Sequence, residues 1–278
     1  MFLSKEYNFD HTKHLDPDKS YLPWVDLTGL FFDVETTTLI PSIKLGKEFD
    51  GLSEEEKEKI LTEKQAELDD QLDSFRIVQF CGILVREQEI IRTVNQIIDP
   101  EIPIPEESSR IHHIYDKDVV GMPTFGDFIP QLRELVKESD YLVAYNGNFD
   151  KLAVEKSIAW YLQRDIDTKV YDPEDDRIRL PLIDPKVWAV RRKQIDRFTK
   201  VFTGNKLSEI AKSYSVSSVA SAAHGNGALH DAFTDTKILV ELVHKMLERG
   251  DIPWTLQETI VDQVQINQSH EDYHSGKK

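Results

Sequence analysis

The order of the predicted elements indicates an α/β domain in which helices flank a mixed β-sheet. Three observations predict this fold class. An apolar run at 29–35 is typical of a buried strand. Two β-rich runs at 75–86 and 88–99 adjoin each other and predict an antiparallel hairpin. The segment 231–249 carries apolar residues with a period near 3.6, which predicts a long amphipathic helix.

The remaining elements are predicted from turn residues, capping residues and periodicity. In chain order they are a helix at 123–138 that contains Pro130, a strand at 141–145, a helix at 148–163, an acidic loop at 164–181, a helix that begins at Asp184 and Pro185, and a helix at 207–214. A segment rich in Ser, Ala and Gly at 213–229 is expected to be mobile and to order when substrate binds, carrying the next residue, His230, into place.

The chain divides into an extension at 1–26, a domain at 27–250 and a C-terminal tail at 251–278. Disorder is expected from about Asn267. Within the domain, 41–73 is an acidic insertion in which Ser53 and Glu56 form a capping-box signature before helix-forming residues. The insertion is interpreted as a solvated surface helix, and a regulatory or partner-binding flap is the alternative.

Composition counts against several classes of protein. A net charge of −16 is unsuited to a protein that coats nucleic acid, although it allows an enzyme that grips one strand end locally. No apolar run has the length of a membrane span, and the first residues lack the apolar core of a signal peptide. Cys81 is the single cysteine, so no internal disulfide is expected and a reducing, cytoplasmic setting is favoured.

Asp33 and Glu35 are unusual because they lie in an otherwise apolar strand. Side chains alternate between the faces of a strand, so these two share one face about 7 Å apart. Two buried carboxylates repel each other and lose hydration, and a divalent cation relieves both costs. The pattern predicts a site for a hard ion such as Mg²⁺ or Mn²⁺, and the alternative is an edge strand with one solvated face.

Asp235 and His230 introduce the last amphipathic helix. Asp235 falls on the apolar stripe, three residues before Ile238 and four before Leu239, where a lone carboxylate is costly. Metal coordination is the favoured interpretation, and a buried salt bridge is the alternative. His230 lies five residues earlier, so it must reach a site from the turn before the helix. An imidazole there could accept a proton from water, or could be a surface histidine at a helix start.

Asp150 follows a predicted strand and opens a predicted helix, within the stretch 146–150. Ligands gather at such strand ends and helix N-termini. The alternative is a first-turn acid that the helix dipole stabilises. The presence of the other three acids favours a ligand role for Asp150.

Three motifs, taken in order, resemble those of the DEDDh (DnaQ-like) exonucleases: DVETT at 33–37, NGNFD at 146–150 and HDAFTD at 230–235. That family contains the proofreading subunit of the bacterial replicative polymerase and has a ribonuclease H-like fold. The resemblance covers about 27–248, with supporting stretches RIVQFCGI at 76–83, PIPEESSRIHHI at 103–114 and LID at 182–184. The sister subgroup has a tyrosine one position nearer the final Asp, so His230 is typical of the histidine branch.

The resemblance implies a 3′→5′ exonuclease that removes nucleoside 5′-monophosphates from single-stranded DNA. The carboxylates that would hold two Mg²⁺ or Mn²⁺ ions are Asp33, Glu35, Asp150 and Asp235, and His230 would be the general base. Two ions can clamp an in-line displacement at phosphorus. The residues that would contact or frame the terminal nucleotide are His112, Asn146 and Phe149, with Thr36 as a backbone donor near the 3′-hydroxyl.

This chain departs from the family pattern in three places. The family usually has Gly where Thr38 and His113 stand, and it has a short loop in place of the insertion at 41–73. The insertion adjoins the first motif, so it could alter access of the substrate. The five core residues are intact, and activity is therefore expected.

A basic segment follows the second motif. From Lys186 to Lys206 there are seven basic residues and one acid. Arg191, Arg192 and Lys193 could guide the nucleic-acid strand or form a solvated face. Their aromatic neighbours, Trp188, Phe198 and Phe202, are assigned to the core, and base stacking is the alternative.

Other functions remain open at this point. The same motifs would serve an exonuclease that trims RNA 3′ ends, because they do not read the 2′-hydroxyl. A module that binds strand ends or a polymerase without cutting is a further alternative, as is a metal-stabilised interaction protein. The expected partner is a single-stranded 3′ end, with DNA favoured over RNA, and a polymerase could be a second partner. No membrane association is expected.

Overall fold

The computed structural model describes residues 18–39, 52–53, 55–57, 59–60, 63, 74–164, 180–195, 204–219 and 230–275. Among these residues, none of the helices is both long and apolar enough to cross a membrane. The predicted mobile segment falls largely outside the described residues, because 220–229 are not included. Most of the predicted acidic loop at 164–181 also lies outside them.

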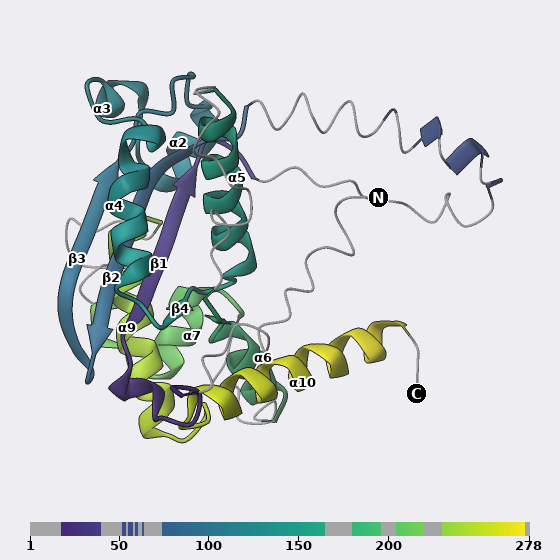
Figure 1. The fold of residues 1–278 in the computed structure, drawn as a ribbon. Coiled ribbons are helices and arrows are strands. Elements are labelled where there is room, and N and C mark those ends of the chain that lie inside the picture. Colours follow the sequence, from purple (N-terminus) through teal and green to yellow (C-terminus); the bar gives the residue numbers. More distant parts are fainter. Residues whose placement is uncertain are drawn as a thin grey trace.

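A five-stranded mixed sheet forms the centre of the molecule, in the order β3-β2-β1-β4-β5 (Figure 1). The antiparallel part comprises β1 (Gly29–Thr36), β2 (Ile77–Arg86) and β3 (Glu89–Ile97). The parallel part adds β4 (Tyr141–Val143) and β5 (Leu182–Ile183) to β1. The mixed sheet, the hairpin and the strands at 29–35 and 141–145 are confirmed. The two-residue strand β5 was too short to show periodicity and was missed.

Helices cover both faces of the sheet, as predicted. On one face α4 (Phe125–Lys137) and α5 (Asn148–Arg164) pack against Leu30, Phe32 and Val34 of β1. On the other face α7 (Leu207–Ser213) and α9 (Ala232–Glu248) share a core with Phe31, together with α6 (Lys186–Ile195). The strand is therefore apolar on both faces, which explains its nearly continuous apolar sequence.

Local capping explains where the helices begin. At the start of α4, the Thr124 hydroxyl accepts a hydrogen bond from the Asp127 backbone N–H, and the Asp127 carboxylate accepts one from the Thr124 backbone N–H. The helix continues through Pro130 as predicted. Two short helices, α2 (Glu106–His112) and α3 (Asp116–Val119), were not predicted, because each is too short and polar to show a hydrophobic period.

Both terminal segments contact the core. Trp24, in the short helix η2 (Trp24–Asp26), is 1% exposed, and its indole donates to the Pro253 carbonyl at 3.0 Å. Helix α10 (Leu256–Ser275) follows and buries Leu256 and Ile260. The prediction of disorder from about Asn267 is wrong: the helix, begun on buried apolar residues, continues to Ser275. The boundaries at 26 and 250 remain predictions, and core packing crosses both.

The insertion is described only in part. Its predicted capping box is confirmed: the Glu56 backbone N–H donates to Ser53 Oγ at 3.3 Å, and the Ser53 N–H donates to the Glu56 carboxylate at 2.9 Å. The backbone is helical at 55–57, 59–60 and 63. The other residues of 41–73 lie outside the described part of the chain.

Candidate active site

The first two carboxylates lie on the face of β1 that α9 covers. Phe31 packs in the core on the α9 side, and residues of the same parity share its face, so Asp33 and Glu35 point there too. Both side chains are half-buried. The structure therefore supports the predicted pair on one side of a buried strand, and it excludes the alternative of an edge strand, because β1 is central.

Asp150 reaches the same strand from the first turn of α5. The register of β4 with β1 ends at the pair Val143 and Phe31. Beyond that point the Asp150 carboxylate accepts a hydrogen bond from the Val34 backbone N–H at 3.2 Å. Asp150 is buried, so it is not simply a surface acid at a helix N-terminus.

Asp235 and His230 arrive with α9. Asp231 is the N-cap, accepting from the Thr234 backbone N–H at 3.1 Å, and Asp235 lies in the first helical turn. His230 precedes the cap with φ +69°, a left-handed backbone conformation that few non-glycine residues adopt. Its backbone N–H donates to the Asp235 carboxylate. His230 and Asp235 are thus linked through the backbone, and His230 lies in the turn before the helix, as the spacing predicted.

Electrostatics show that the four carboxylates face one another. Burial raises the pKa of Asp33 well above its usual range, and the charges of Asp150, Glu35 and Asp235 raise it further. Burial, then Asp235 and Asp150, raises the pKa of Glu35 to about 9. Burial raises the pKa of Asp150 despite the Val34 hydrogen bond, and it raises that of Asp235 to about 6. Such shifts arise when acids share a site with too little cationic charge.

The donor set suits a hard divalent ion. Four carboxylates offer only oxygen atoms, which Mg²⁺ and Mn²⁺ prefer, and a cation among them would remove their mutual repulsion. In the part of the chain that the structure describes, no three acidic, imidazole or thiol side chains already stand in an arrangement that could hold one ion. The oxygen-only donor set nevertheless fits such an ion by its chemistry.

Gln79 joins the strand pair to the helix, and sequence reasoning missed it. It lies opposite Glu35 in the register of β2 with β1 and is 2% exposed. Its Nε2 donates to Asp231 Oδ1 at 2.7 Å, and its Oε1 accepts from the Ala232 backbone N–H at 3.1 Å. These bonds hold the start of α9 against the sheet between His230 and Asp235. The available signal was a lone amide within the apolar run RIVQFCGI.

Thr37 fastens the end of β1 to its surroundings. It is fully buried, and its Oγ1 donates to the Ser74 carbonyl at 2.7 Å. Its backbone N–H donates to the Arg76 carbonyl at 2.8 Å, and its own carbonyl accepts from Ser108 Oγ at 2.6 Å. Thr37 thus joins the two chain segments that flank the insertion, and it attaches α2 to the end of β1.

Two neighbouring histidines at the end of α2 border the site. His112 is buried beside the Thr36 backbone, its Nδ1 accepts from the Ile114 N–H at 3.1 Å, and its Nε2 has no hydrogen-bond partner in the described structure. Burial lowers its pKa to about 4, which keeps the ring neutral near pH 7. His113 is exposed, has φ +62°, and lies within electrostatic reach of His230. The positive φ accounts for a glycine in the family pattern at this position.

The second motif turns sharply after β4. Asn146 has φ +63°, and its backbone N–H donates to Asp184 Oδ1 at 3.0 Å. The same Asp184 oxygen accepts from the Lys186 N–H, which confirms the predicted acidic start of α6. Phe149 is half-buried and packs on the core between the sheet and α4. The structure therefore places Asn146 and Phe149 immediately before Asp150, at the same strand end.

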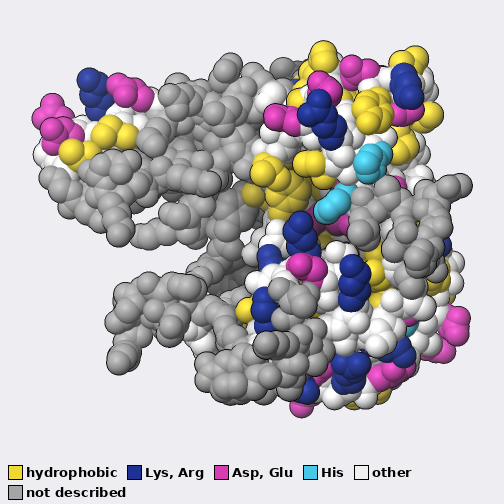
Figure 2. Space-filling view, turned by 180° about the vertical axis from the view of Figure 1, so that it is seen from behind, with side chains coloured by type: hydrophobic (Ala, Val, Ile, Leu, Met, Phe, Trp, Pro, Cys, Tyr) yellow, Lys and Arg dark blue, Asp and Glu magenta, His cyan; other side chains and the backbone are white. Residues whose placement is uncertain are grey.

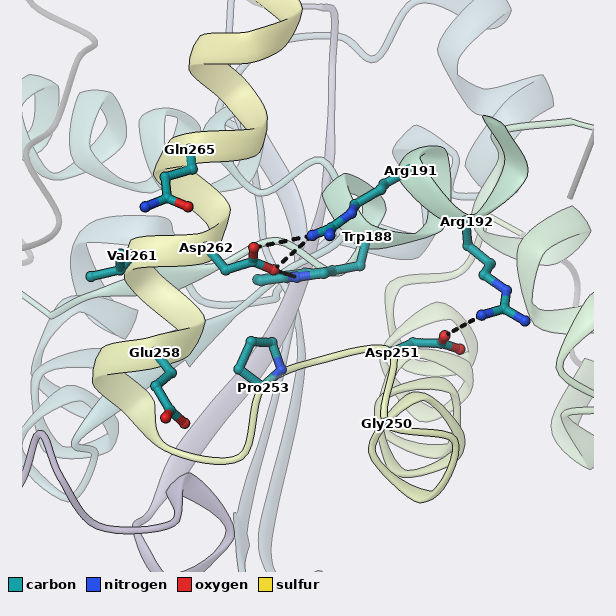
Figure 3. A pocket seen from close by; sticks show the side chains of 10 residues that line it. All are labelled: Trp188, Arg191, Arg192, Gly250, Asp251, Pro253, Glu258, Val261, Asp262 and Gln265. Carbon is teal, nitrogen blue, oxygen red and sulfur yellow. Dashed lines mark hydrogen bonds and ion pairs between the residues drawn. The ribbon is translucent and has the colours of Figure 1, made fainter. Parts of the chain in front are cut away.

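The predicted strand-guiding arginines lie elsewhere. Arg191 forms an ion pair with Asp262 of α10 at 3.0 Å, and Arg192 pairs with Asp251 at 3.2 Å. Figure 3 shows both pairs at the rim of a 660 Å³ cavity that α6 and α10 line, with Trp188 beside it. Trp188 is buried, as predicted. None of the four carboxylates lines this cavity. The third predicted residue, Lys193, donates a hydrogen bond from its Nζ to Asn205 Oδ1.

Comparison with known proteins identifies a family and several similar sequences. The exonuclease family model RNase_T matches residues 30–243. The DNA polymerase III subunit epsilon of Treponema pallidum is 28% identical over 97 residues, which are 35% of this chain and 45% of that protein. The chain spans less than half the length of the curated relatives it matches.

Two solved structures share the fold. A single-stranded DNA complex of E. coli exonuclease I has a TM-score of 0.54 and 15% identity, over 81% of this chain and 41% of that one. A 3′-exonuclease described with a histone mRNA stem-loop has a TM-score of 0.51 and 13% identity, over 86% and 68%. At these identities the similarity establishes the fold, a mixed sheet flanked by helices.

Proposed function

The chain belongs to the exonuclease family whose model spans residues 30–243, and from this premise we propose that it is a 3′→5′ exonuclease. It would remove nucleoside 5′-monophosphates from the 3′ end of single-stranded DNA with two divalent ions, Mg²⁺ or Mn²⁺. One observation carries the proposal: carboxylates from β1, α5 and α9 lie within electrostatic reach of one another, and the His230 backbone N–H donates to Asp235.

The carboxylates would hold the ions. Asp33 and Glu35 would contribute from the strand, Asp150 and Asp235 from the two helix starts. Bound there, divalent ions would supply Lewis-acid charge to the phosphate under attack. Asp150 and Asp235 each also accept a hydrogen bond from a backbone N–H, which helps to hold these carboxylates beside β1 and the turn before α9.

His230 would accept the proton of the attacking water. Burial, Lys206 and His113 together lower its pKa, so the ring is neutral and basic near pH 7. Its exposed position at the turn leaves it open to solvent and to substrate. The backbone of His230 is left-handed, and the residue lies before the first turn of α9. The ring would therefore approach the carboxylates from outside the helix, which a residue at a regular helical position could not do.

The terminal nucleotide would lie against Thr36, His112, Asn146 and Phe149. The buried Nε2 of His112 has no hydrogen-bond partner in the described structure, and a hydroxyl or phosphate oxygen of the substrate could satisfy it. The half-buried ring of Phe149 offers an apolar surface to a base. We favour DNA over RNA as the substrate because the epsilon relative is a subunit of a DNA polymerase. For the same reason a polymerase is the proposed partner. A cytoplasmic location belongs to the same proposal.

The test is incubation with 5′-labelled single-stranded DNA, and in parallel with RNA, in the presence of Mg²⁺. Stepwise shortening and release of nucleoside 5′-monophosphates are expected. Asp33→Ala and His230→Ala should each lower the rate at least about 100-fold. Asp26→Ala is the matched control, because Asp26 is exposed at the opposite end of β1 and should leave the rate unchanged.

The outcomes separate the alternatives. Faster release from RNA than from DNA would redirect the proposal to an RNA-trimming enzyme. Tight binding of strand ends without release of mononucleotides, in Mg²⁺ and in Mn²⁺, would indicate a non-catalytic binding module and would overturn the proposal.

A further inference from the structure

A chain with a net charge of −16 must present local cations to bind a polyanion. The ions at the carboxylates would neutralise the phosphate under attack but not the phosphates beyond it. Figure 2 shows Lys and Arg side chains spread over one face of the molecule, below neighbouring histidines. The question is which of these cations lie beside the site and have charge to offer.

Lys186 is tied to the second motif. Its Nζ donates to Asn146 Oδ1 at 2.8 Å, so its ammonium group lies at the turn that follows β4, four residues before Asp150. The partner is a neutral amide. Such a contact positions the ammonium group and leaves its charge available to a phosphate.

Asn205 brings two more lysines to this strand end. The Tyr145 hydroxyl, adjacent to Asn146, donates to the Asn205 carbonyl at 2.7 Å. Lys193 Nζ donates to Asn205 Oδ1 at 3.1 Å. Lys206 follows directly, is exposed, and lies within electrostatic reach of His230. Three lysines from α6 and from the start of α7 thus converge on the edge that carries Asn146 and His230.

The two arginines differ from these lysines. The Arg191 and Arg192 guanidinium groups are paired with the carboxylates of Asp262 and Asp251, whereas Lys186 and Lys193 contact neutral amide oxygens. A phosphate would have to compete with a carboxylate for either arginine. Lys186 lies within electrostatic reach of the Asp184 carboxylate, but its hydrogen bond goes to an amide oxygen, which a phosphate displaces more readily than it displaces a paired carboxylate.

We propose that Lys186, Lys193 and Lys206 form a phosphate-binding track for the single strand behind its 3′-terminal nucleotide. The inference rests on the proposed exonuclease function and names the protein groups that grip the strand. The track reads backbone phosphates and no base, so it binds strands of any sequence. It assigns a structural role to Arg191 and Arg192 at the α6–α10 contact.

The test uses two substrates, dT12 and the dinucleotide dTpT, with Mg²⁺ and release of thymidine 5′-monophosphate as the readout. The variants are Lys186→Gln and Lys193→Gln. Each should raise KM for dT12 about fivefold at low salt and lower the slope of log KM against log salt by about 0.7. For dTpT, which has a single phosphodiester, KM should not change. The value of kcat should be unchanged for both substrates.

Lys137→Gln is the matched control. Lys137 is an exposed lysine at the end of α4. It lies near the start of β4, whereas the candidate site follows the other end of that strand. Unchanged KM for dT12 in both variants, or the same rise in Lys137→Gln, would overturn the track. An equal rise for dTpT would assign the lysines to the terminal nucleotide and would also overturn it. A wild-type enzyme that releases no mononucleotide from either substrate would overturn the proposed function itself.

Discussion

Asp33, Glu35 and Asp150 occupy positions where an ionised carboxylate is costly. Each has a pKa raised first by burial and, for the strand pair, then by its acidic neighbours. Hydrogen bonding relieves only part of the cost, because Asp150 accepts from a single strand N–H at 3.2 Å. Groups held in such unfavourable states mark candidate functional sites, and under the proposed function a bound cation would relieve this cost.

The first prediction concerns pH and stability without metal. In the folded protein Glu35 has a pKa of about 9, against 4.5 for the ordinary group, so the folded state binds more protons than the unfolded state between these values. The free energy of unfolding should therefore fall as pH rises from about 5 to 9. Denaturant unfolding in EDTA at several pH values measures this slope, and Mg²⁺ should remove most of it.

A variant identifies the source of that slope. Asp33→Asn combined with Glu35→Gln removes two of the charges, so its stability in EDTA should vary less over the same pH range, with Asp150 and Asp235 giving the remainder. A wild-type protein equally stable in EDTA at pH 5 and pH 9 would contradict the prediction.

At the scale of elements, the site depends on how α9 meets the sheet. Asp235 lies in its first turn, and His230 is the residue before its N-cap. Gln79 of β2 holds this helix start in place through hydrogen bonds with Asp231 and Ala232. Such supporting hydrogen bonds commonly alter activity when they are removed, although they do not touch substrate.

The second prediction tests this docking. Gln79→Leu leaves the Ala232 N–H and the Asp231 carboxylate without their partner, so kcat should fall about 10-fold or more, with a smaller change in KM. The free energy of unfolding should fall by about 1–3 kcal/mol.

Gln263→Leu is the matched comparison for Gln79→Leu. Gln263 is a buried amide on α10 whose side chain donates to the Leu182 carbonyl at 2.9 Å. Its loss should cost similar stability, measured by denaturant unfolding, with less effect on kcat. Equal kcat values for the two variants would argue that Gln79 acts only through stability.

The third prediction concerns Ser217 and Ser218, near the end of the described stretch 204–219. Burial alone would raise the pKa of Glu241, but hydrogen bonds from Ser218 and Ser217 lower it to about 2. The stabilising effect of the carboxylate is complete above pH 4.5 and is lost as pH falls toward 2. Glu241→Gln should lower the free energy of unfolding by about 2 kcal/mol at pH 7 and by much less near pH 2. Thermal unfolding at both pH values measures it, and an equal loss at both would contradict the assignment.

At the scale of the whole molecule, residues 22–24 pair with residues 253–256. Trp24 binds the Pro253 carbonyl, and the Leu256 N–H donates to the Leu22 carbonyl at 3.3 Å. Helix α10 then buries Leu256, Ile260 and Ile266. The body of the fold therefore includes residues on both sides of the family match at 30–243.

The fourth prediction follows from this packing. Deletion of 256–278 should lower the free energy of unfolding by about 5 kcal/mol or more, because three buried aliphatic side chains are lost. Deletion of 270–278 should shift Tm by no more than about 2 °C, since the described residues just before it, 267–269, are exposed. Calorimetry distinguishes the two, and similar Tm losses would show that the second half of α10 also packs.

Sequence patterns located most of the elements, among them β1, the hairpin, α5 and α9. The cost of charge in apolar segments singled out Asp33, Glu35 and Asp235, whose roles stay predictions. The elements were located because local geometry converts spacing along the chain directly into a shared face. Short elements such as α2 and β5 escaped prediction, since two to seven residues hold too little pattern.

Tertiary structure alone decided which groups meet. It placed Gln79 against the start of α9, turned Lys193 toward Asn205, and paired Arg191 with Asp262 on a helix that was expected to be a tail. These contacts join residues far apart in the chain. Side-chain partners of that kind are set by the packing of whole elements, and no local pattern records them.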